Sequence, residues 1–194
     1  MATIGSVCVY CGSLTGTNAR HAETARRLGQ LLAGHNMRLI YGGGRVGLMG
    51  QVADAVIEAG GRVIGVIPEH LEVKEVGHHG LAELRVVGSM HERKTQMFEL
   101  ADGFVILPGG FGTLDEAFEM MTWRQLGLHD KPIVFLDVDG YWAPFGTLVE
   151  HVIAEGFARA NSRELFTMVS DVELVIPTLL RQPAATVPDA VRRM

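Results

Sequence analysis

The sequence has few lysines, few cysteines and no long apolar run, and each shortage disfavours a class of protein. Its three lysines, Lys74, Lys94 and Lys131, leave few candidates for Schiff-base chemistry. No stretch approaches the roughly 18 apolar residues of a membrane span, and no basic segment precedes the opening residues as in a secretory signal. The net charge of -5 disfavours nucleic acid as the main partner. We therefore expect a cytoplasmic protein that binds neither membranes nor nucleic acid.

The two cysteines, Cys8 and Cys11, form a C-x-x-C pattern that can serve as a redox or metal pair. The residues around them indicate a buried strand, on which positions three apart point to opposite faces and lie about 10 Å apart. A disulfide needs Cα atoms within about 7 Å, and no second cysteine pair completes a zinc site. Two reduced thiols are therefore expected.

Apolar runs alternate with helical patterns along a chain of 194 residues, 47% of them hydrophobic and 20% charged. This composition is typical of a globular protein. We expect strands at residues 4–10, 37–41, 62–67, 84–87, 104–107, 133–136 and 165–169. We expect helices at residues 18–33, 47–59, 89–102, 114–126 and 145–153, and a weak one between Pro177 and Pro183.

This alternation predicts a single α/β domain over residues 1–181, followed by a tail at 182–194. The expected fold is a doubly wound parallel sheet with helices on both faces, because its strands read as near-continuous apolar runs. Such sheets bind ligands beyond the carboxyl ends of their strands, near the point where the strand order reverses. The 24 glycines of the chain include two clusters, which follow the second and fifth expected strands at that edge.

The first glycine loop has the pattern G-x-G-x-x-G between a strand and a helix and contains Gly42, Gly43, Gly44 and Gly47. Glycine lets backbone amides approach an anion, and the helix N-terminus adds positive charge, so this loop is a candidate phosphate site. A dinucleotide site would also need an acidic residue after the next strand, which Glu69 provides only loosely. A purely structural turn is the remaining alternative.

The second glycine loop contains Gly109, Gly110 and Gly112 and lacks the G-K-[ST] of a Walker A loop. It too offers backbone amides just before a helix. Thr113 and Glu116 have the T-x-x-E spacing of a capping box. From the residues alone, Glu116 is therefore either a helix cap or a functional carboxylate.

Between the loops, Ser89 and Glu92 form a second capping box, followed by Arg93 and Lys94 in the first turn of the helix. Two cations there oppose the helix dipole by about 0.3–1 kcal/mol each. Either an anionic partner offsets this cost or both side chains extend into water.

Other polar residues give weak signals, and no metal site is expected. His78 and His79 are adjacent but have no evident third ligand, and His91 is typical of a surface residue. Asp137 and Asp139 follow an expected strand, where a role in a turn is the simpler interpretation.

The chain resembles the LOG (Lonely Guy) family over roughly residues 5–157. The resemblance depends on the segments VCVYCGS, YGGGRVGLMG, SMHERK, PGGFGTLDE and TWRQLGLHDKP. The family's paired signature, arginine-lysine followed by PGGxGTxxE, matches Arg93-Lys94 and residues 108–116. Two departures are Asp115, where many plant members have glutamate, and Phe111, where they commonly have tyrosine. Neither removes a catalytic group.

The resemblance implies a Rossmann-like domain that dimerises and cleaves the N-glycosidic bond of a purine nucleoside 5′-monophosphate without a cofactor. Arg93 and Glu116 would be the catalytic pair. Some relatives have been labelled lysine decarboxylases, but nothing around the three lysines suggests a pyridoxal site. The implied substrate-binding residues are Glu75, Arg93, Lys94, Gly110, Phe111, Gly112, Thr113, Leu114, Asp115, Glu116 and Thr122.

We therefore expect hydrolysis of AMP or an N6-prenylated relative to free base and ribose 5-phosphate. The alternative is a non-catalytic carrier of a nucleotide or of molybdopterin on the same fold. A third hypothesis, an NAD-dependent oxidoreductase, has much less support. The hydrolase and carrier hypotheses differ at Arg93 and Glu116, which only the enzyme needs as a pair.

Overall fold

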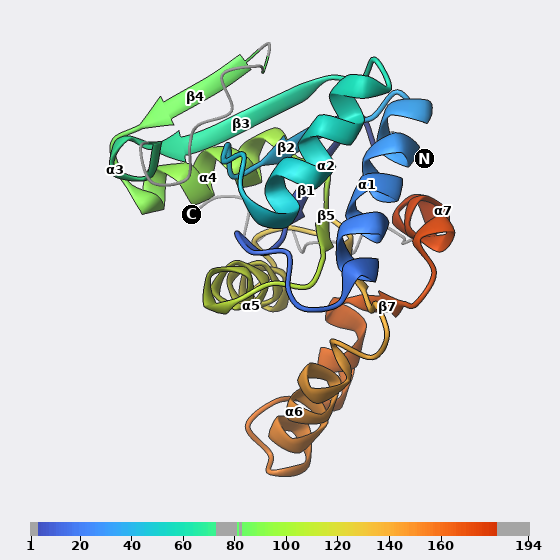
Figure 1. The fold of residues 1–194 in the computed structure, drawn as a ribbon. Helices are drawn as coiled ribbons and strands as arrows, with labels where there is room; N and C mark the ends of the chain where they lie inside the picture. The colour runs from blue at the N-terminus through green and yellow to red at the C-terminus, as the bar shows by residue number, and fades with distance from the viewer. Residues whose placement is uncertain (1–3, 73–80, 82, 182–194) are drawn as a thin grey trace.

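The computed structural model describes residues 4–72, 81 and 83–181, and Figure 1 shows how its elements are arranged. Among these residues, seven parallel strands form one sheet in the order β4-β3-β2-β1-β5-β6-β7. The strands are β1 (Ser6–Tyr10), β2 (Arg38–Tyr41), β3 (Val63–Pro68), β4 (Glu83–Val87), β5 (Gly103–Ile106), β6 (Ile133–Leu136) and β7 (Thr167–Val169).

Helices cover both faces of the sheet, as the alternating pattern predicts. The α-helices are α1 (Ala19–Gly34), α2 (Gly47–Glu58), α3 (Glu69–Glu72), α4 (Met90–Leu100), α5 (Phe111–Gln125), α6 (Ala143–Ala154) and α7 (Val175–Arg181). Two 3-10 helices, η1 (Ala160–Leu165) and η2 (Val172–Leu174), complete the described elements. None of the described helices is long and apolar enough to span a membrane.

Two apolar cores lie on opposite faces of the sheet. Helices α1, α2 and α7 contribute to one core, whereas α4, α5 and α6 contribute to the other. Side chains of β1 alternate between them, with Val7 and Val9 in the first core and Cys8 and Tyr10 in the second. Cys11, directly after β1, continues the alternation in the first core. Cys8 and Cys11 are buried, free thiols, and their opposite directions confirm the expectation from strand periodicity. The doubly wound, Rossmann-like fold is therefore confirmed.

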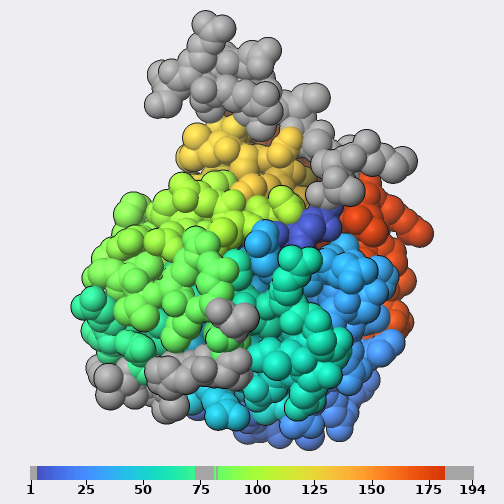
Figure 2. Space-filling model, turned by 90° about the horizontal axis from the view of Figure 1, so that it is seen from above, coloured from blue at the N-terminus to red at the C-terminus, as the bar shows by residue number. Residues whose placement is uncertain are grey.

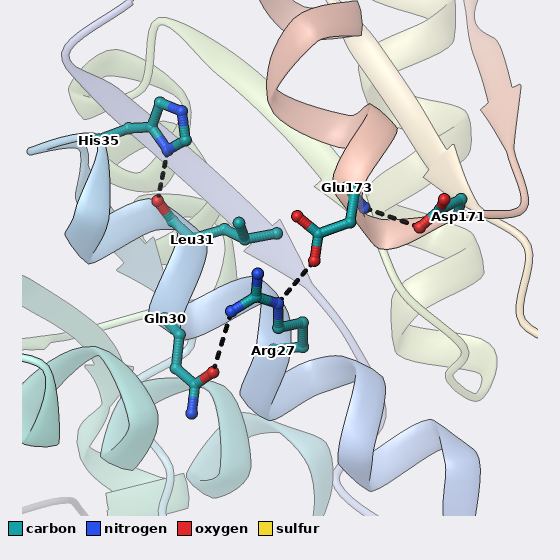
Figure 3. Close-up of polar contacts among 6 residues, drawn as sticks. All are labelled: Arg27, Gln30, Leu31, His35, Asp171 and Glu173. Atoms are coloured by element: carbon teal, nitrogen blue, oxygen red, sulfur yellow. Dashed lines mark hydrogen bonds and ion pairs between the residues drawn. The ribbon is translucent and has the colours of Figure 1, made fainter.

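The last two elements, η2 and α7, lie beside α1 (Figure 1), and Figure 2 shows the red C-terminal segment beside the blue N-terminal part of the chain. Nε of Arg27 donates to Oε1 of Glu173 at 2.6 Å, and Asp171 caps η2 by accepting from the Glu173 N–H at 3.0 Å (Figure 3). Both side chains of the ion pair are about half exposed, so its contribution to the free energy of unfolding is small. Packing of the buried Val175, Ile176 and Leu179 holds α7.

The structure corrects two local predictions and adds one short helix. The added helix is α3, directly after β3. Helix α5 begins at Phe111 rather than near residue 114. Helix α7 contains Pro177 as its third residue, where the missing N–H is tolerated because the first helical amides have no intrahelical acceptor.

Candidate active site

The sheet forms a cleft where its strand order reverses, at the carboxyl ends of β1 and β5. The cleft has a volume of about 160 Å³. It shares Gly12, Ser13 and Gly110 with a neighbouring cleft of about 360 Å³. The neighbouring cleft falls in the usual range of small-molecule sites, about 300–1,000 Å³, and the first cleft is smaller. The residues lining the first cleft are Val9, Tyr10, Cys11, Gly12, Ser13, Gly42, Met49, Arg93, Met97, Gly110, Phe111, Gly112, Thr113 and Glu116.

Arg93 is buried at the edge of this cleft and does not extend into water. Ser89 caps α4 by accepting from the Glu92 N–H at 3.1 Å, as the capping box predicts. One turn later, the Arg93 side chain enters the protein and is only 6% exposed. Its Nε donates to the Val66 carbonyl at 3.2 Å and its Nη2 to the Gly42 carbonyl at 3.0 Å. Backbone within β3 and directly after β2 thus fixes the orientation of the guanidinium group.

Glu116 lies in the second turn of α5, and its side chain is buried at the cleft with 9% exposure. The capping-box interpretation of Thr113 and Glu116 is wrong, because the N-cap residue is Gly110 and no side chain caps the helix. The Leu114 N–H already donates to the Gly110 carbonyl at 3.1 Å. Thr113 is therefore the third residue of the helix rather than its cap.

Arg93 and Glu116 act electrostatically on the same buried thiol. Burial raises the pKa of the Cys11 thiol far above its usual range, the negative charge of Glu116 raises it further, and the positive charge of Arg93 lowers it. Burial likewise raises the pKa of the Cys8 thiol, and the same two charges act on it in the same opposing directions. Both thiols therefore stay protonated near neutral pH and are poor nucleophiles.

The start of α5 presents backbone to the cleft. A Cβ atom added at Gly110 or Gly112 would meet nothing within 4 Å, so a ligand can approach the backbone closely at both positions. Oη of Tyr141 donates to the Gly109 carbonyl at 2.5 Å and fixes the loop that precedes the helix. A helix N-terminus without a capping side chain attracts anions. This segment therefore fits the predicted phosphate-binding role of the second loop.

The first glycine loop contributes less to the cleft than its pattern suggests. Of its four predicted phosphate-binding glycines, only Gly42 lines the cleft, whereas Gly43, Gly44 and Gly47 do not. Gly47 has a φ of 58°, and a Cβ there would overlap the backbone of Ser13 and Leu14. Within this loop, glycine thus permits close packing of two backbone segments.

The segment Cys11-Gly12-Ser13 lines the cleft and was not among the predicted site residues. The Gly12 N–H donates to the Pro108 carbonyl at 3.0 Å, and its carbonyl accepts from the Leu48 N–H at 3.0 Å. Gly12 therefore joins the two glycine-loop regions. Its position after β1, the strand beside the reversal of strand order, is the signal that could have identified it.

Other predicted site residues lie away from this cleft. Leu114 packs against the second core, and Asp115 forms an ion pair with Lys94. Thr122 lines a separate groove between α5 and α6. Glu75 lies outside the described residues.

The polar residues considered for a metal have other surroundings. No group of three or more His, Cys, Asp or Glu residues suited to a metal ion is found in the described part of the chain. His91 is exposed, and His78 and His79 lie outside the described residues. The Asp137 carboxylate accepts the Trp142 N–H at 2.7 Å, and Asp139 has a positive φ of 54°, so both residues have the predicted turn role.

Replacement of Gly42 by alanine should impair both stability and the site. The added Cβ would overlap Nη2 of Arg93 and lie 3.1 Å from Sδ of Met49. Overpacking of this kind typically costs about 1–3 kcal/mol. We expect a lower melting temperature and displacement of the Arg93 guanidinium, measured by thermal unfolding and by crystallography of the variant.

Gly34→Ala is the matched control, because a Cβ there meets nothing within 4 Å and the residue ends α1. This variant should unfold at or slightly above the wild-type temperature. If Gly42→Ala also keeps the wild-type melting temperature and Arg93 geometry, the close contact does not constrain Arg93.

Solved structures share this fold at low sequence identity. The molybdenum cofactor carrier protein from Chlamydomonas reinhardtii has a TM-score of 0.68 and 18% identity, over 93% of this chain and 98% of that protein's chain. The molybdenum cofactor binding protein from Rippkaea orientalis has a TM-score of 0.63 and 22% identity, over 89% and 91% of the two chains. These similarities establish the fold alone.

Sequence comparison is more specific. The family profile described as "Possible lysine decarboxylase" matches residues 49–179. The cytokinin riboside 5′-monophosphate phosphoribohydrolase of Rhodococcoides fascians is 45% identical over 175 residues, covering 90% of this chain and 88% of that protein. The enzyme of the same name designated LOG4 in Arabidopsis thaliana is 44% identical over 161 residues, covering 83% of this chain and 75% of that protein. This chain therefore belongs to the LOG family, which the profile describes as possible lysine decarboxylases.

Proposed function

We propose that this protein is a phosphoribohydrolase that cleaves the N-glycosidic bond of adenosine-type 5′-monophosphates. Its substrate is AMP or an N6-prenylated cytokinin riboside 5′-monophosphate, and its products are the free base and ribose 5-phosphate. One observation carries the proposal: a buried arginine, a buried glutamate and an uncapped helix N-terminus meet in a single cleft. The names of the relatives support the same substrate class.

The geometry suggests how the reaction proceeds. The 5′-phosphate binds the backbone amides at the start of α5, which places the ribose toward Glu116. As the bond from C1′ to the base breaks, its electron pair leaves with the base and positive charge develops on the sugar. Water then bonds to C1′, and in the net reaction one of its protons passes to the base.

Glu116 and Arg93 have distinct parts in this proposal. A carboxylate beside the sugar stabilises its developing positive charge, holds the ribose hydroxyls or takes the proton from water. Arg93, fixed by two backbone carbonyls, orients Glu116 or the nucleotide. Binding energy from the remote phosphate lowers the barrier at the glycosidic bond.

The proposed substrate contacts are the cleft residues Arg93, Gly110, Phe111, Gly112, Thr113 and Glu116. Glu75 joins them on the family resemblance. Gly42 belongs to the site as the residue whose carbonyl holds Arg93.

Hydrolysis should depend strongly on the 5′-phosphate. Removing a hydrogen bond to a charged group costs about 1.5–3 kcal/mol, and the start of α5 offers several amides. We therefore expect kcat/KM for adenosine to be lower than that for AMP by roughly 100-fold or more. Chromatographic assay of released adenine at matched concentrations measures the ratio. Comparable kcat/KM values would exclude the phosphate as the anchor.

The described lysines do not fit a pyridoxal-dependent decarboxylase. Lys94 is held by two carboxylates. Nζ of Lys131 donates to the Phe98 carbonyl at 2.7 Å and lies 3.9 Å from the centroid of the Phe98 ring. Neither lysine lines the candidate cleft. Lys74 lies outside the described residues. The proposed reaction therefore has no step that uses a pyridoxal cofactor.

We propose that the protein is a homodimer formed through a groove between α5 and α6. Apolar side chains dominate this groove, which has a volume of about 240 Å³. Phe118, Leu148 and Phe157 line it and are 41%, 47% and 87% exposed. An exposed apolar surface of this kind is typical of a protein interface. Thr122 lines the same groove. If Thr122 contacts the substrate, as the family resemblance implies, the substrate-binding cleft lies near the dimer interface.

Replacement of Leu148 by glutamate should therefore give monomers, because the interface would bury an unpaired charge. Light scattering measures the mass of the wild type and variant. Leu174→Glu is the control, since Leu174 is 50% exposed and lies outside the groove. A monomeric wild-type protein at micromolar concentration would refute this interface.

We also propose a cytoplasmic location. The two cysteines are reduced and buried, as is usual for proteins of reducing compartments. Cell fractionation tests this location.

A further inference from the structure

Lys94 follows Arg93 on α4 but does not line the cleft. Its Nζ atom lies 3.2 Å from Oδ2 of Asp115 and 3.1 Å from Oε1 of Glu119. The side chains of Lys94 and Glu119 are only 17% and 21% exposed. Solvent and salt therefore screen their ion pair less than they would screen a fully exposed one.

The two partners of Lys94 flank Glu116 on α5. Asp115 and Glu119 are four residues apart, so they lie one turn apart on the same face of the helix. Oε2 of Glu119 is buried and accepts no hydrogen bond from the described residues. Lys94 is thus the cation that compensates this partly buried carboxylate in the described structure.

We propose that Lys94 is a positioning residue whose ion pairs with Asp115 and Glu119 hold α4 and α5 together, so that Arg93 and Glu116 keep their relative positions. This inference rests on the proposed function of those two residues. Direct substrate binding by Lys94, which the family resemblance implies, is the competing hypothesis. Partial burial lowers the pKa of Lys94, but the carboxylates of Glu119 and Asp115 raise it overall, so the ammonium group stays charged.

Positioning and substrate binding predict different kinetics. Small displacements of catalytic groups slow the chemical step by up to about 100-fold, whereas loss of a ground-state contact raises KM. In Lys94→Met we expect kcat for AMP to fall about 10- to 100-fold with little change in KM. Glu119→Gln should show the same pattern with a smaller loss, although it leaves Lys94 in place.

Two further variants test the ion pair itself. Lys94→Arg keeps the charge and should retain most of the wild-type kcat. The double variant Lys94→Met/Glu119→Gln should be no slower than Lys94→Met alone, because the second change removes the uncompensated carboxylate. Arg163→Met is the control, since it breaks an exposed ion pair with Glu150 and should leave both constants unchanged.

Hydrogen exchange provides a readout that does not require turnover. In Lys94→Met, amides of residues 111–119 should exchange faster than in the wild type, whereas those of α1 should not change. A raised KM with unchanged kcat, or wild-type kinetics in Glu119→Gln, would overturn the positioning role. If wild-type protein hydrolyses no nucleotide, the proposed function fails, and unchanged exchange at residues 111–119 would separately refute the inference.

Discussion

Arg93→Ala should lose at least about 100-fold in the rate of AMP hydrolysis and should also unfold at a lower temperature. The rate falls because the arginine is one of the two charged groups among the described residues that line the cleft, and removing such a preorganised group commonly costs about 100- to 1,000-fold. Stability falls because the carbonyls of Val66 and Gly42 lose their buried donor. An unsatisfied buried polar group costs about 1–3 kcal/mol. Steady-state kinetics and thermal unfolding measure the two effects.

Arg93→Lys tests whether positive charge alone suffices. A lysine cannot reproduce the planar donors that reach two separate carbonyls, so this variant should stay slow. His91→Ala is the control on the same helix, because His91 is exposed and makes none of these contacts. Near-normal hydrolysis by Arg93→Ala would show that Arg93 has only a structural role.

Glu116→Gln should lower the rate of hydrolysis by roughly 100-fold or more, the usual scale for losing an acid–base group. The substitution keeps the shape of the side chain but removes its negative charge beside the proposed ribose site. Because glutamine keeps the size of this buried side chain and Gly110 is the N-cap of α5, the melting temperature should change little. Initial rates with saturating AMP and thermal unfolding of the same preparations measure both quantities.

Glu99→Gln is the control for Glu116, since it removes an exposed carboxylate of α4 that does not line the cleft. Its rate should match that of the wild type. Retention of most AMP hydrolysis by Glu116→Gln would exclude Glu116 as the catalytic carboxylate. Glu75 would then be the next candidate on the family resemblance.

Much of the fold could be predicted because strands buried on both faces are continuous apolar runs. Strand β6 was expected at residues 133–136 and lies at Ile133–Leu136. The alternation of strands and helices fixed the class of fold for the same reason. Burial of Cys8 and Cys11 on opposite faces followed from strand periodicity.

The start of α5 could not be placed from local pattern. The T-x-x-E spacing of Thr113 and Glu116 is compatible with a capping box, but Gly110 and Gly112 also permit the helix to begin earlier. The local sequence does not distinguish the two helix starts, because the two glycines fit a loop as well as the first turn of a helix. The start of the helix decides the role of Glu116. With the start at Phe111, Glu116 is not a helix cap, and its side chain lines the cleft.

Burial of Arg93 also depended on distant residues. Its acceptors are 27 and 51 residues away along the chain. Val66 lies within β3 and Gly42 directly follows β2, so only the fold brings them to Arg93. Likewise, the two glycine loops look alike in sequence. Side chains or backbone fill the Cβ positions of Gly42, Gly43 and Gly47 in the first loop, whereas Gly110 and Gly112 in the second leave open space at the cleft. Close approach to a ligand and close approach to another backbone both require glycine.

The most direct test of the proposed function is incubation of the wild-type protein with AMP, followed by chromatographic measurement of adenine and ribose 5-phosphate. The proposed phosphoribohydrolase predicts equal amounts of the two products, formed in proportion to enzyme concentration and strongly reduced with Glu116→Gln. Calorimetry on the same preparation shows whether AMP binds. Saturable binding of AMP that is then recovered intact would contradict hydrolysis and identify a nucleotide carrier.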